Sequence, residues 1–406
     1  MKKPPSLLRG ILFSLAIALI ITVLYLAGSF EPVENLVYDA ARRLQGEQPR
    51  DSSLLLVTID EASLKKVGRW PWPRSVMARI LNIITEGNPA AIGVDIGFFE
   101  PGEEDPESDA RLIKATKESG RVIYPVYITA LPSLGEIAAF QKPFSKLAGA
   151  AAGIGHAHTE PSLDGVVRKV YLTQECGGET IPAFALTLVQ QYLSRKGKVP
   201  EILLGPDGIS VGEIRIPTLS HTPQRADDQP FLIGQNHLLY ISFAGPTGSF
   251  LALPAWQVLE GGISASLFRN KIVMIGATAA GLGDISMTPF STDRKPMPGV
   301  ETQVNIINTI LMENFITRTQ TIWTIIEIFF LSLAAGWIFY SLTTRESILA
   351  FLFFLLSVAG IYLILLFQAG IWIDAWPLLA VILGNYLIVI VRKLGFLFRA
   401  LDGEIK

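Results

Sequence analysis

The sequence is poor in cysteine and in charged residues, and both shortages narrow its possible functions. Cys176 is the only cysteine among 406 residues, so the chain cannot close an intrachain disulfide and lacks the multi-cysteine patterns of zinc and redox sites. We interpret Cys176 as a small apolar residue near the end of a strand. Asp, Glu, Lys and Arg make up only 17% of the residues, and the formal net charge is −2. So weak a charge provides no field for a polyanion, and we expect no nucleic-acid partner.

Hydrophobic residues, in contrast, make up 50% of the chain, so membrane spans are expected. Four apolar runs are about as long as a bilayer core requires. We predict transmembrane helices over residues 10–30, 321–343, 347–369 and 374–391. The first run could also be a cleavable signal peptide, because Ala27-Gly28-Ser29 offers small residues. Its apolar stretch is longer than signal peptides usually carry, which favours an uncleaved anchor in contact with the lipid bilayer.

Basic residues predict the orientation of these spans. They cluster at segments that four crossings place on one side of the membrane: Lys2, Lys3, Arg9, Arg345, Arg392, Lys393 and Arg399. The turn at 368–374, on the other side, has no lysine or arginine. By the positive-inside rule, residues 1–9 and 392–406 are cytoplasmic tails and residues 31–320 lie outside the cytoplasm.

A glutamate and an asparagine within the apolar runs have side chains that suggest a role there. Glu327 is near the outer end of its span, where it could reach headgroups or a neighbouring helix, and a proton relay is the alternative. Asn385 in the last span is interpreted as a helix–helix hydrogen bond.

The external region begins with apolar strands that alternate with amphipathic helices. Strands are predicted over 54–60, 91–99 and 121–130, and helices over 75–87 and 107–120. This order predicts right-handed crossovers and a mainly parallel sheet with both faces covered. Further predicted segments are a strand at 165–173, a helix at 183–195, a small antiparallel insertion at 201–217, a buried strand at 271–278 and a helix at 299–316. The predicted fold class is an α/β domain plus four transmembrane α-helices.

Six strings in this order resemble the CHASE type 2 family, the cyclase- and histidine-kinase-associated sensory extracellular domains. They are VGRWPWPRSVMARIL (67–81), AIGVDIGFFEP (91–101), ESDARL (107–112), LDGVVRKVYL (163–172), KIVMIGATAAGLGDISMTPF (271–290) and PGVETQVNIINTIL (298–311). The resemblance covers roughly residues 31–320, and the arrangement of one helix before and three after is similar as well.

The resemblance implies the input module of a bacterial receptor in the inner (plasma) membrane, a homodimer that senses an unknown extracytoplasmic ligand or condition. Relatives pass the signal to a cytoplasmic cyclase or kinase, which here would be truncated or act in trans, because only residues 392–406 follow the last span. No enzyme activity is expected of the chain itself. The alternative is a membrane-anchored scaffold for an extracytoplasmic assembly.

Trp70, Trp72 and Arg74 alternate with prolines, which stiffen the backbone and could present the rings and guanidinium to a ligand. Alternatively, the string is a rigid turn that seats the helix beginning near Ser75, with the tryptophans in the core.

Asp60, Asp95 and Asp284 each follow a predicted strand, at the sheet edge where open α/β sheets bind ligands. Three carboxylates there could bind a cation, or each could cap a helix or satisfy loop amides. The glycine-rich loop at 276–284 lacks the GxGxxG and P-loop spacings, so we predict no cofactor.

His156, His158 and Glu160 would share one face of an extended segment, which could form half of a transition-metal site. The family resemblance gives this hypothesis no support. Asp164-Gly165 followed by Arg168 is interpreted as a turn and a charge pair on a strand.

Overall fold

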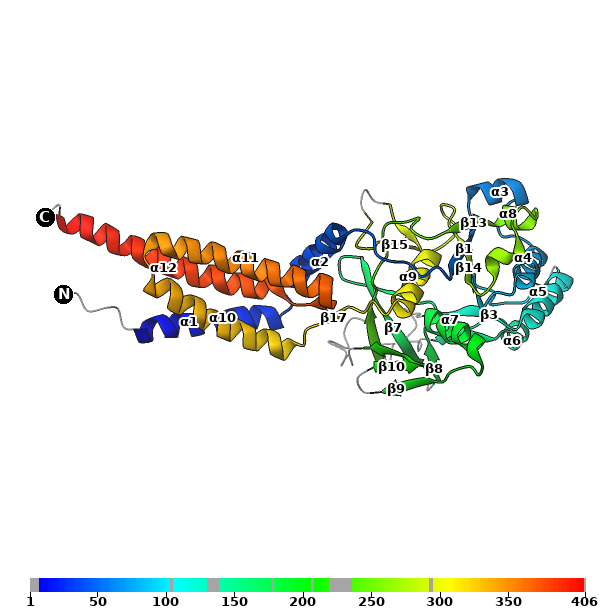
Figure 1. Ribbon diagram of the computed structural model, residues 1–406, viewed down its shortest axis with the longest axis horizontal. Helices are drawn as coiled ribbons and strands as arrows, with labels where there is room; N and C mark the ends of the chain where they lie inside the picture. Colours follow the sequence, from blue (N-terminus) through cyan, green and yellow to red (C-terminus); the bar gives the residue numbers. More distant parts are fainter. Residues whose placement is uncertain are drawn as a thin grey trace. The chain divides into compact units, whose positions relative to one another are not determined.

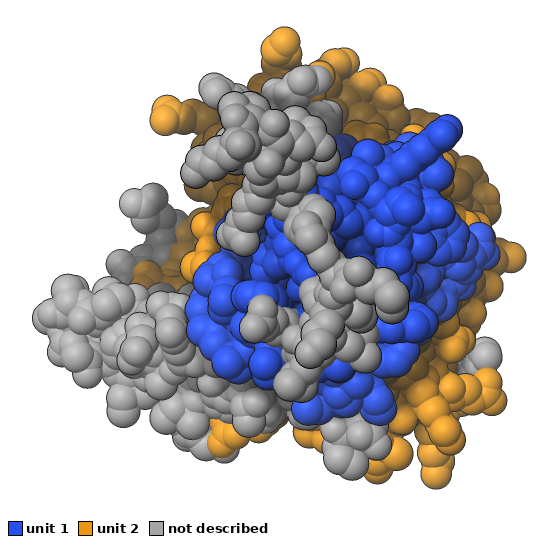
Figure 2. Space-filling model, turned by 90° about the vertical axis from the view of Figure 1, so that its left-hand side faces the viewer, with its two compact units in different colours: residues 1–44, 316–406 blue, residues 45–315 orange. Residues whose placement is uncertain are grey.

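The computed structural model divides the chain into two compact units. The first holds residues 1–44 and 316–406, and the second holds residues 45–315 (Figures 1 and 2). The structure describes residues 7–102, 105–129, 139–176, 179–205, 208–218, 236–291 and 295–404.

The first unit contains the long apolar helices. They are α1 (Leu7–Leu26), α10 (Thr321–Ser341), α11 (Thr344–Ala369) and α12 (Ala375–Glu404), with α2 (Glu31–Gln45) following α1. By length and composition, α10, α11 and the Ala375–Gly395 part of α12 are each able to cross a membrane. Helix α1 passes the same test only when counted together with α2, from which it bends by 80°.

Polar side chains join three of these helices. Ser14 Oγ of α1 donates a hydrogen bond to Asn385 Oδ1 of α12 over 2.8 Å, and Asn385 Nδ2 donates to Ser332 Oγ of α10 over 2.9 Å. The predicted helix–helix hydrogen bond of Asn385 is therefore confirmed. Glu327 is half-buried on α10, and its role stays a prediction.

Two short strands of the first unit precede α10 and α12, and an arginine connects them to the helices. Strand β17 (Thr317–Arg318) pairs in parallel with β18 (Ile371–Trp372). Arg318 lies 2.8 Å from a Glu31 carboxylate oxygen at the start of α2, donates from Nε to Asp374 over 2.8 Å, and covers the Trp372 ring at 4.9 Å. This cluster links the residues that precede α10 to α2 and to the start of α12.

The second unit is built on a mainly parallel seven-stranded sheet. Its parallel strands run in the order β13 (Ala252–Pro254), β1 (Leu54–Ile59), β14 (Ile272–Ala277), β2 (Ala91–Asp95), β3 (Val122–Thr129) and β5 (Gly153–His156), and β4 (Ala139–Gln141) pairs antiparallel with β3. The predicted parallel sheet is confirmed.

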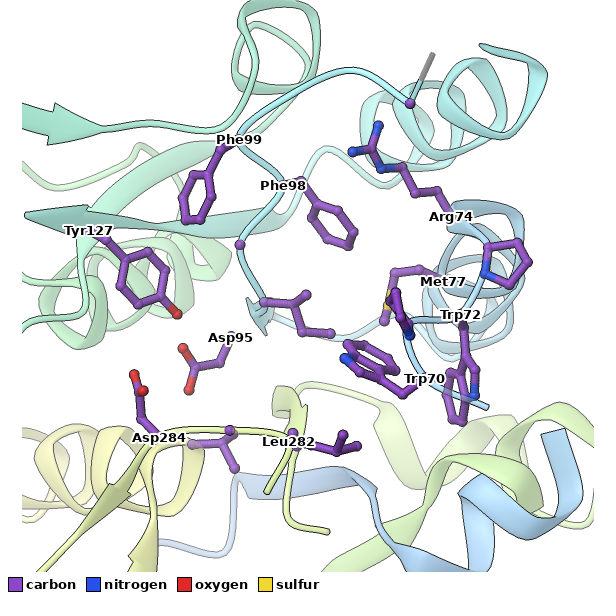
Figure 3. A pocket seen from close by; sticks show the side chains of 18 of the residues that line it. Trp70, Trp72, Arg74, Met77, Asp95, Phe98, Phe99, Tyr127, Leu282 and Asp284 are labelled. Atoms are coloured by element: carbon purple, nitrogen blue, oxygen red, sulfur yellow. The ribbon is translucent and has the colours of Figure 1, made fainter. Parts of the chain in front are cut away.

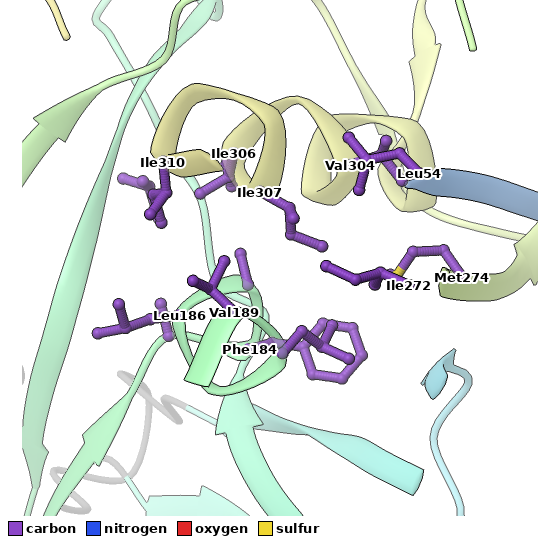
Figure 4. Close-up of a cluster of buried hydrophobic side chains, with 14 of the residues drawn as sticks. Leu54, Phe184, Leu186, Val189, Ile272, Met274, Val304, Ile306, Ile307 and Ile310 are labelled. Atoms are coloured by element: carbon purple, nitrogen blue, oxygen red, sulfur yellow. The ribbon is translucent and has the colours of Figure 1, made fainter. Parts of the chain in front are cut away.

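Alternation along the buried strands distributes side chains to two apolar cores. From β1, Leu55, Val57 and Ile59 pack against α4 (Arg74–Glu86), α5 (Pro106–Ser119) and α8 (Ala255–Leu259). Leu54 and Leu56 point to the other face and pack with α7 (Phe184–Leu193) and α9 (Gly299–Leu311) (Figure 4). Helices thus cover both faces of the sheet, as expected for strands that are apolar throughout.

The order of the strands creates a crevice between β14 and β2. The chain passes from β2 to β3 through α5 on one face, whereas β14 leads to α9 on the other face. Because the two connections diverge, the carboxyl ends of these neighbouring strands are left uncovered, and this is where open α/β sheets bind ligands.

Among the described residues, three smaller sheets complete the unit, one of them the two-stranded pair of β15 (Ile285–Ser286) and β16 (Met297–Pro298). Strands β9 (Ile202–Gly205), β10 (Gly208–Val211) and β11 (Ile214–Pro217) form the predicted antiparallel insertion. Strands β6 (Glu160–Pro161), β7 (Val167–Cys176), β8 (Glu179–Pro182) and β12 (Asn236–Tyr240) form the third, and Cys176 ends its strand as predicted.

Two boundary predictions were wrong. The helix expected over 299–316 ends at Leu311, because Glu313 adopts a left-handed backbone conformation with φ 49°. The strand expected over 91–99 ends at Asp95, because Gly97 and the residues around it turn away from the sheet instead of continuing the ladder. Residues 96–102 form a loop, held where Phe144 N–H donates to the Phe98 carbonyl over 2.9 Å.

Candidate ligand-binding site

A cavity of about 1080 Å³ opens at the carboxyl edge of the sheet, at the crevice between β14 and β2 (Figure 3). Its wall comes from the turn before α4, the loop after β2, the start of α5, strand β3, the loop after β14 and the first turn of α9. Five of the six residues that the sequence singled out as ligand contacts line it: Trp70, Trp72, Arg74, Asp95 and Asp284.

Asp95 lies on the cavity floor as the last residue of β2, opposite Gly276 of β14. Among the residues that the structure describes, it has neither a hydrogen-bond donor nor a cation as partner. Burial raises the pKa of its carboxyl to about 7, and the charge of Asp284 contributes to the rise. A carboxylate that titrates near neutrality inside a cavity is typical of a functional site.

Asp284 approaches Asp95 from the loop after β14, and Figure 3 shows the two carboxylates close together. Its own side chain is exposed to the cavity mouth. The backbone is fixed because Gly299 N–H donates to the Asp284 carbonyl over 2.7 Å, next to the pairing of β15 (Ile285–Ser286) with β16 (Met297–Pro298). The carboxylate therefore sits at the point where the loop joins α9.

Tyr127 of β3 completes the floor. Its hydroxyl points toward Asp95 in Figure 3, and its ring meets the ring of Phe99 edge-on at 5.5 Å. Burial raises the pKa of Tyr127, and the carboxylates of Asp95 and Asp284 raise it further. The phenol therefore stays protonated and can donate a hydrogen bond.

Arg74 is engaged within the cavity wall. Its guanidinium pairs with Asp109 and donates to the Glu100 carbonyl, and it lies over the rings of Phe98 at 5.6 Å and Phe144 at 5.2 Å. The second oxygen of Asp109 accepts from Gly102 N–H over 2.8 Å. Arg74 thus holds the loop after β2 against α5.

The two tryptophans differ in exposure. Trp72 is only 8% exposed and donates from Nε1 to the Gly68 carbonyl over 2.8 Å, which fits the rigid-turn interpretation. Trp70 is half-buried, packs edge-on against Trp72 at 5.5 Å and contributes its ring to the cavity wall.

Asp60 does not join the other two aspartates, and this part of the prediction needs correction. Helix α3 (Glu61–Val67) begins directly after it, and Asp60 Oδ1 accepts from Ser63 N–H over 2.8 Å as the N-cap. The carboxylate turns back to the helix and does not line the cavity.

The histidine motif forms no metal centre in the described part of the chain, where no group of three or more His, Cys, Asp or Glu could hold an ion. Burial lowers the pKa of His156 to about 3 and also lowers that of His158, so both imidazoles are neutral. Arg168 pairs with Asp164 at 2.7 Å, which confirms the predicted charge pair.

In a comparison with known families, the model of the CHASE2 domain matches residues 15–342. The chain belongs to the CHASE2 family. CHASE2 domains are sensory extracellular domains, so the chain is a membrane protein with a sensory role. Comparisons with the curated proteins and with the solved structures returned no match.

Three aromatic residues of the CHASE2 cavity escaped the sequence analysis: Phe98, Phe99 and Tyr127. All three stood within segments predicted as buried strands, where an aromatic residue is ordinary. The only signal was that Phe98 and Phe99 follow Asp95 and Gly97, a carboxylate and a glycine at the end of a parallel strand.

Replacement of Asp95 by asparagine is expected to stabilise the CHASE2 domain above neutral pH. The folded chain retains a proton on Asp95 up to a pKa of about 7, whereas an unfolded aspartate releases it near 3.9, so stability falls as pH rises between these values. Asparagine removes this loss. At pH 8 we expect a gain of about 1–3 kcal/mol, reduced from the full shift because the cavity admits water.

Thermal unfolding of the full chain in detergent, at about pH 8 and about pH 4, measures this effect, which should vanish at the lower pH. The matched control is Asp60→Asn, since asparagine caps a helix as well as aspartate does. Equal stability of Asp95→Asn and the parent chain at the higher pH would contradict the prediction.

Proposed function

We propose that this chain is the input module of a bacterial transmembrane signalling receptor and that its ligand binds in the cavity at the sheet edge. The observation that carries the proposal is Asp95, which has no partner among the described residues and lies in a cavity where β2 and β14 diverge, in a domain of a sensory family. Residues 31–320 then lie outside the cytoplasm, and both termini lie inside.

Helix α9 is the element best suited to carry the signal away from the cavity. Gly299 and Val300 in its first turn line the cavity, and Gly299 is bonded to Asp284. From Val300 to Ile310 every residue of α9 is buried. Because close-packed interiors transmit strain, a displacement at the first turn moves the helix as a body.

From α9 the chain continues through Arg318 into α10, the first C-terminal membrane helix. Arg318 is bound to Glu31 and Asp374, so a shift in its backbone alters contacts with α2 and the start of α12. In our proposal, ligand binding favours one of two packings of the four helices, within a homodimer. A cytoplasmic cyclase or kinase, fused or in trans, responds to that change.

The test joins the catalytic domain of a nucleotide cyclase after Lys406 and measures cyclic nucleotide in cells while low-molecular-weight fractions of the medium are exchanged. Allosteric couplings are typically 1–3 kcal/mol, so at least one fraction should change activity by about fivefold or more. The double variant Asp95→Asn/Asp284→Asn should lose that response.

Activity that no fraction changes, together with a stable extracytoplasmic partner in pull-downs from membranes, would favour a scaffold instead of a receptor. Fusions with one helical residue inserted after Lys406 serve as the control for linker geometry, because the response must depend on the medium and not on the junction.

A further inference from the structure

Among the residues that the structure describes, the charges that line the cavity do not balance. These residues supply one cation, Arg74, and four carboxylates, which are Asp95, Asp105, Asp109 and Asp284. Arg74 is paired with Asp109, and Asp105 caps α5 by accepting from Ser108 N–H over 3.0 Å. Asp95 and Asp284 remain without a cationic partner among the described residues.

An uncompensated carboxylate in a cavity favours some ligands over others. Burial of a charge is costly unless a counter-charge accompanies it. A neutral ligand could replace the hydration of Asp95 only through its own hydrogen-bond donors and would leave the charge uncompensated, and an anion would add repulsion. A cation supplies the counter-charge that the described residues of the cavity floor do not provide.

The walls above this floor are aromatic. Trp70 from the turn before α4 and Phe98 and Phe99 from the loop after β2 line the cavity above the floor, and Tyr127 of β3 adds its ring at the floor itself (Figure 3). Aromatic faces attract cations within about 6 Å of their centroids, most strongly when water is excluded. Arg74 already interacts with the Phe98 ring in this way.

The size of the cavity and the small number of side chains that could coordinate an ion argue against a bare metal ion. At about 1080 Å³ the cavity is slightly larger than the range of about 300 to 1,000 Å³ that is typical of sites for organic ligands, and far larger than a bare ion needs. Within the described ranges no cluster of three or more His, Cys, Asp or Glu could coordinate an ion.

We infer that the cavity binds an organic cation, a molecule with a protonated amine or quaternary ammonium group held at Asp95 and Asp284 and with its carbon skeleton against the aromatic wall. The inference rests on the proposed function, which places the sensed ligand in this cavity. It adds the chemical class of that ligand.

Binding of a cation has a consequence for protons. Asp95 faces Asp284 and Tyr127 on the cavity floor, while the Arg74–Asp109 pair lies in the wall. A positive charge beside Asp95 favours its ionised form and lowers its pKa from about 7. At pH 7 binding should therefore release about half a proton, and the affinity should fall as pH is lowered.

Isothermal titration calorimetry on the full chain in detergent tests the inference. The probes are choline, putrescine and spermidine, and the neutral analogues 3,3-dimethylbutanol and 1,4-butanediol match choline and putrescine in shape. We expect at least one amine to bind, its neutral analogue to bind about tenfold or more weakly, and Asp95→Asn to weaken the amine about tenfold, as for loss of 1.4 kcal/mol. Asp60→Asn, outside the cavity, should bind as the parent does.

A second readout separates a role in binding from a change in folding. The heat of binding at pH 7 should depend on the ionisation enthalpy of the buffer, and this dependence should disappear in Asp95→Asn. Equal affinity for an amine and its neutral analogue, unchanged affinity in Asp95→Asn, or no binding of any amine at about 10 mM, weaker than specific sites show, would each overturn the inference.

The experiments test the ligand class and the proposed function separately. An amine that binds with these properties but does not change the activity of the cyclase fusion supports the ligand class and contradicts sensing through the helices. A neutral compound that changes the activity through the cavity supports sensing and overturns the ligand class.

Discussion

Replacement of Arg74 by methionine is expected to lower the free energy of unfolding of residues 45–315 by about 3 kcal/mol. This is the effect typical of removing one partner of a buried ion pair. The side chain of Arg74 is only 19% exposed and that of Asp109 only 9% exposed. Without the guanidinium, the Asp109 carboxylate keeps the Gly102 amide as donor but loses its counter-charge. Methionine retains most of the apolar stem, so the loss reports mainly on the charge.

The measurement is urea unfolding of the full chain in detergent, followed by tryptophan fluorescence. Arg111→Met is the matched control, because Arg111 forms an ion pair with Glu107 on the surface of α5, where both side chains are more than half exposed. Exposed pairs of this kind contribute about 0.3–0.5 kcal/mol. Similar losses for the two variants would show that the Arg74 pair is solvated and does not hold the wall of the cavity.

The double variant Arg74→Met/Asp109→Leu separates two effects of the single variant. One is the free-energy cost of leaving the Asp109 carboxylate without a counter-charge, and the other is the loss of the hydrogen bonds that hold the loop after β2. Removal of both charges should recover part of the stability, as when a buried pair is replaced by apolar residues. The Gly102 amide and the Glu100 carbonyl still lose their partners, so the recovery should be incomplete.

The sequence predicted the sheet well because its strands are buried on both faces. Short apolar runs such as 54–59 and 272–277 are best explained as buried strands when the segments between them have the periodicity of helices. Edge strand β13 and the short helix α8 were not predicted, because three to five residues carry no period. The end of β2 was misplaced because Ile96, Phe98 and Phe99 are as apolar as the strand before them.

The candidate site was predicted from the same rule of topology, and the rule worked only in part. It placed Asp95 and Asp284 at one sheet edge, where the structure brings them together. It also placed Asp60 there, although a helix that begins at the next residue recruits the carboxylate as a cap. Strand order decides which aspartates meet. The order β1-β14-β2 depends on the pairing of Leu54 with Ile272, which are more than 200 residues apart in the sequence, and no local pattern reveals this pairing.

Replacement of Gly276 by alanine is expected to destabilise the second unit by about 2–3 kcal/mol, because overpacking of a close-packed core costs about this much. A Cβ atom at Gly276 would lie 2.6 Å from Cβ of Val300 and 2.7 Å from its Cγ2. Neither atom lies at the end of a flexible chain, so strand β14 and the first turn of α9 must separate. The two elements meet beside the cavity, where Val300 lines the wall.

Gly262→Ala is the control for a glycine with room for a methyl group, since the nearest atom to its Cβ would be the Gln257 carbonyl oxygen at 3.8 Å. Its effect on urea unfolding should be near zero or slightly stabilising. Val300→Gly removes the clashing Cβ, so the double variant with Gly276→Ala should be more stable than the sum of the two single losses predicts, by about 1 kcal/mol or more. Additive losses would show that α9 does not press on β14 at this point.

The same variant tests whether α9 carries the signal. If α9 moves as a body, the added methyl group at Gly276 should change the basal activity of the cyclase fusion in the absence of any added compound. Leu81→Ala, a core truncation outside the cavity that is expected to cost at least as much stability, should leave that activity unchanged. Both variants would be assayed in the same membranes with their amounts matched by immunoblot. An equal change in both would assign the effect to lost stability, and a change confined to Gly276→Ala would assign it to the position of α9.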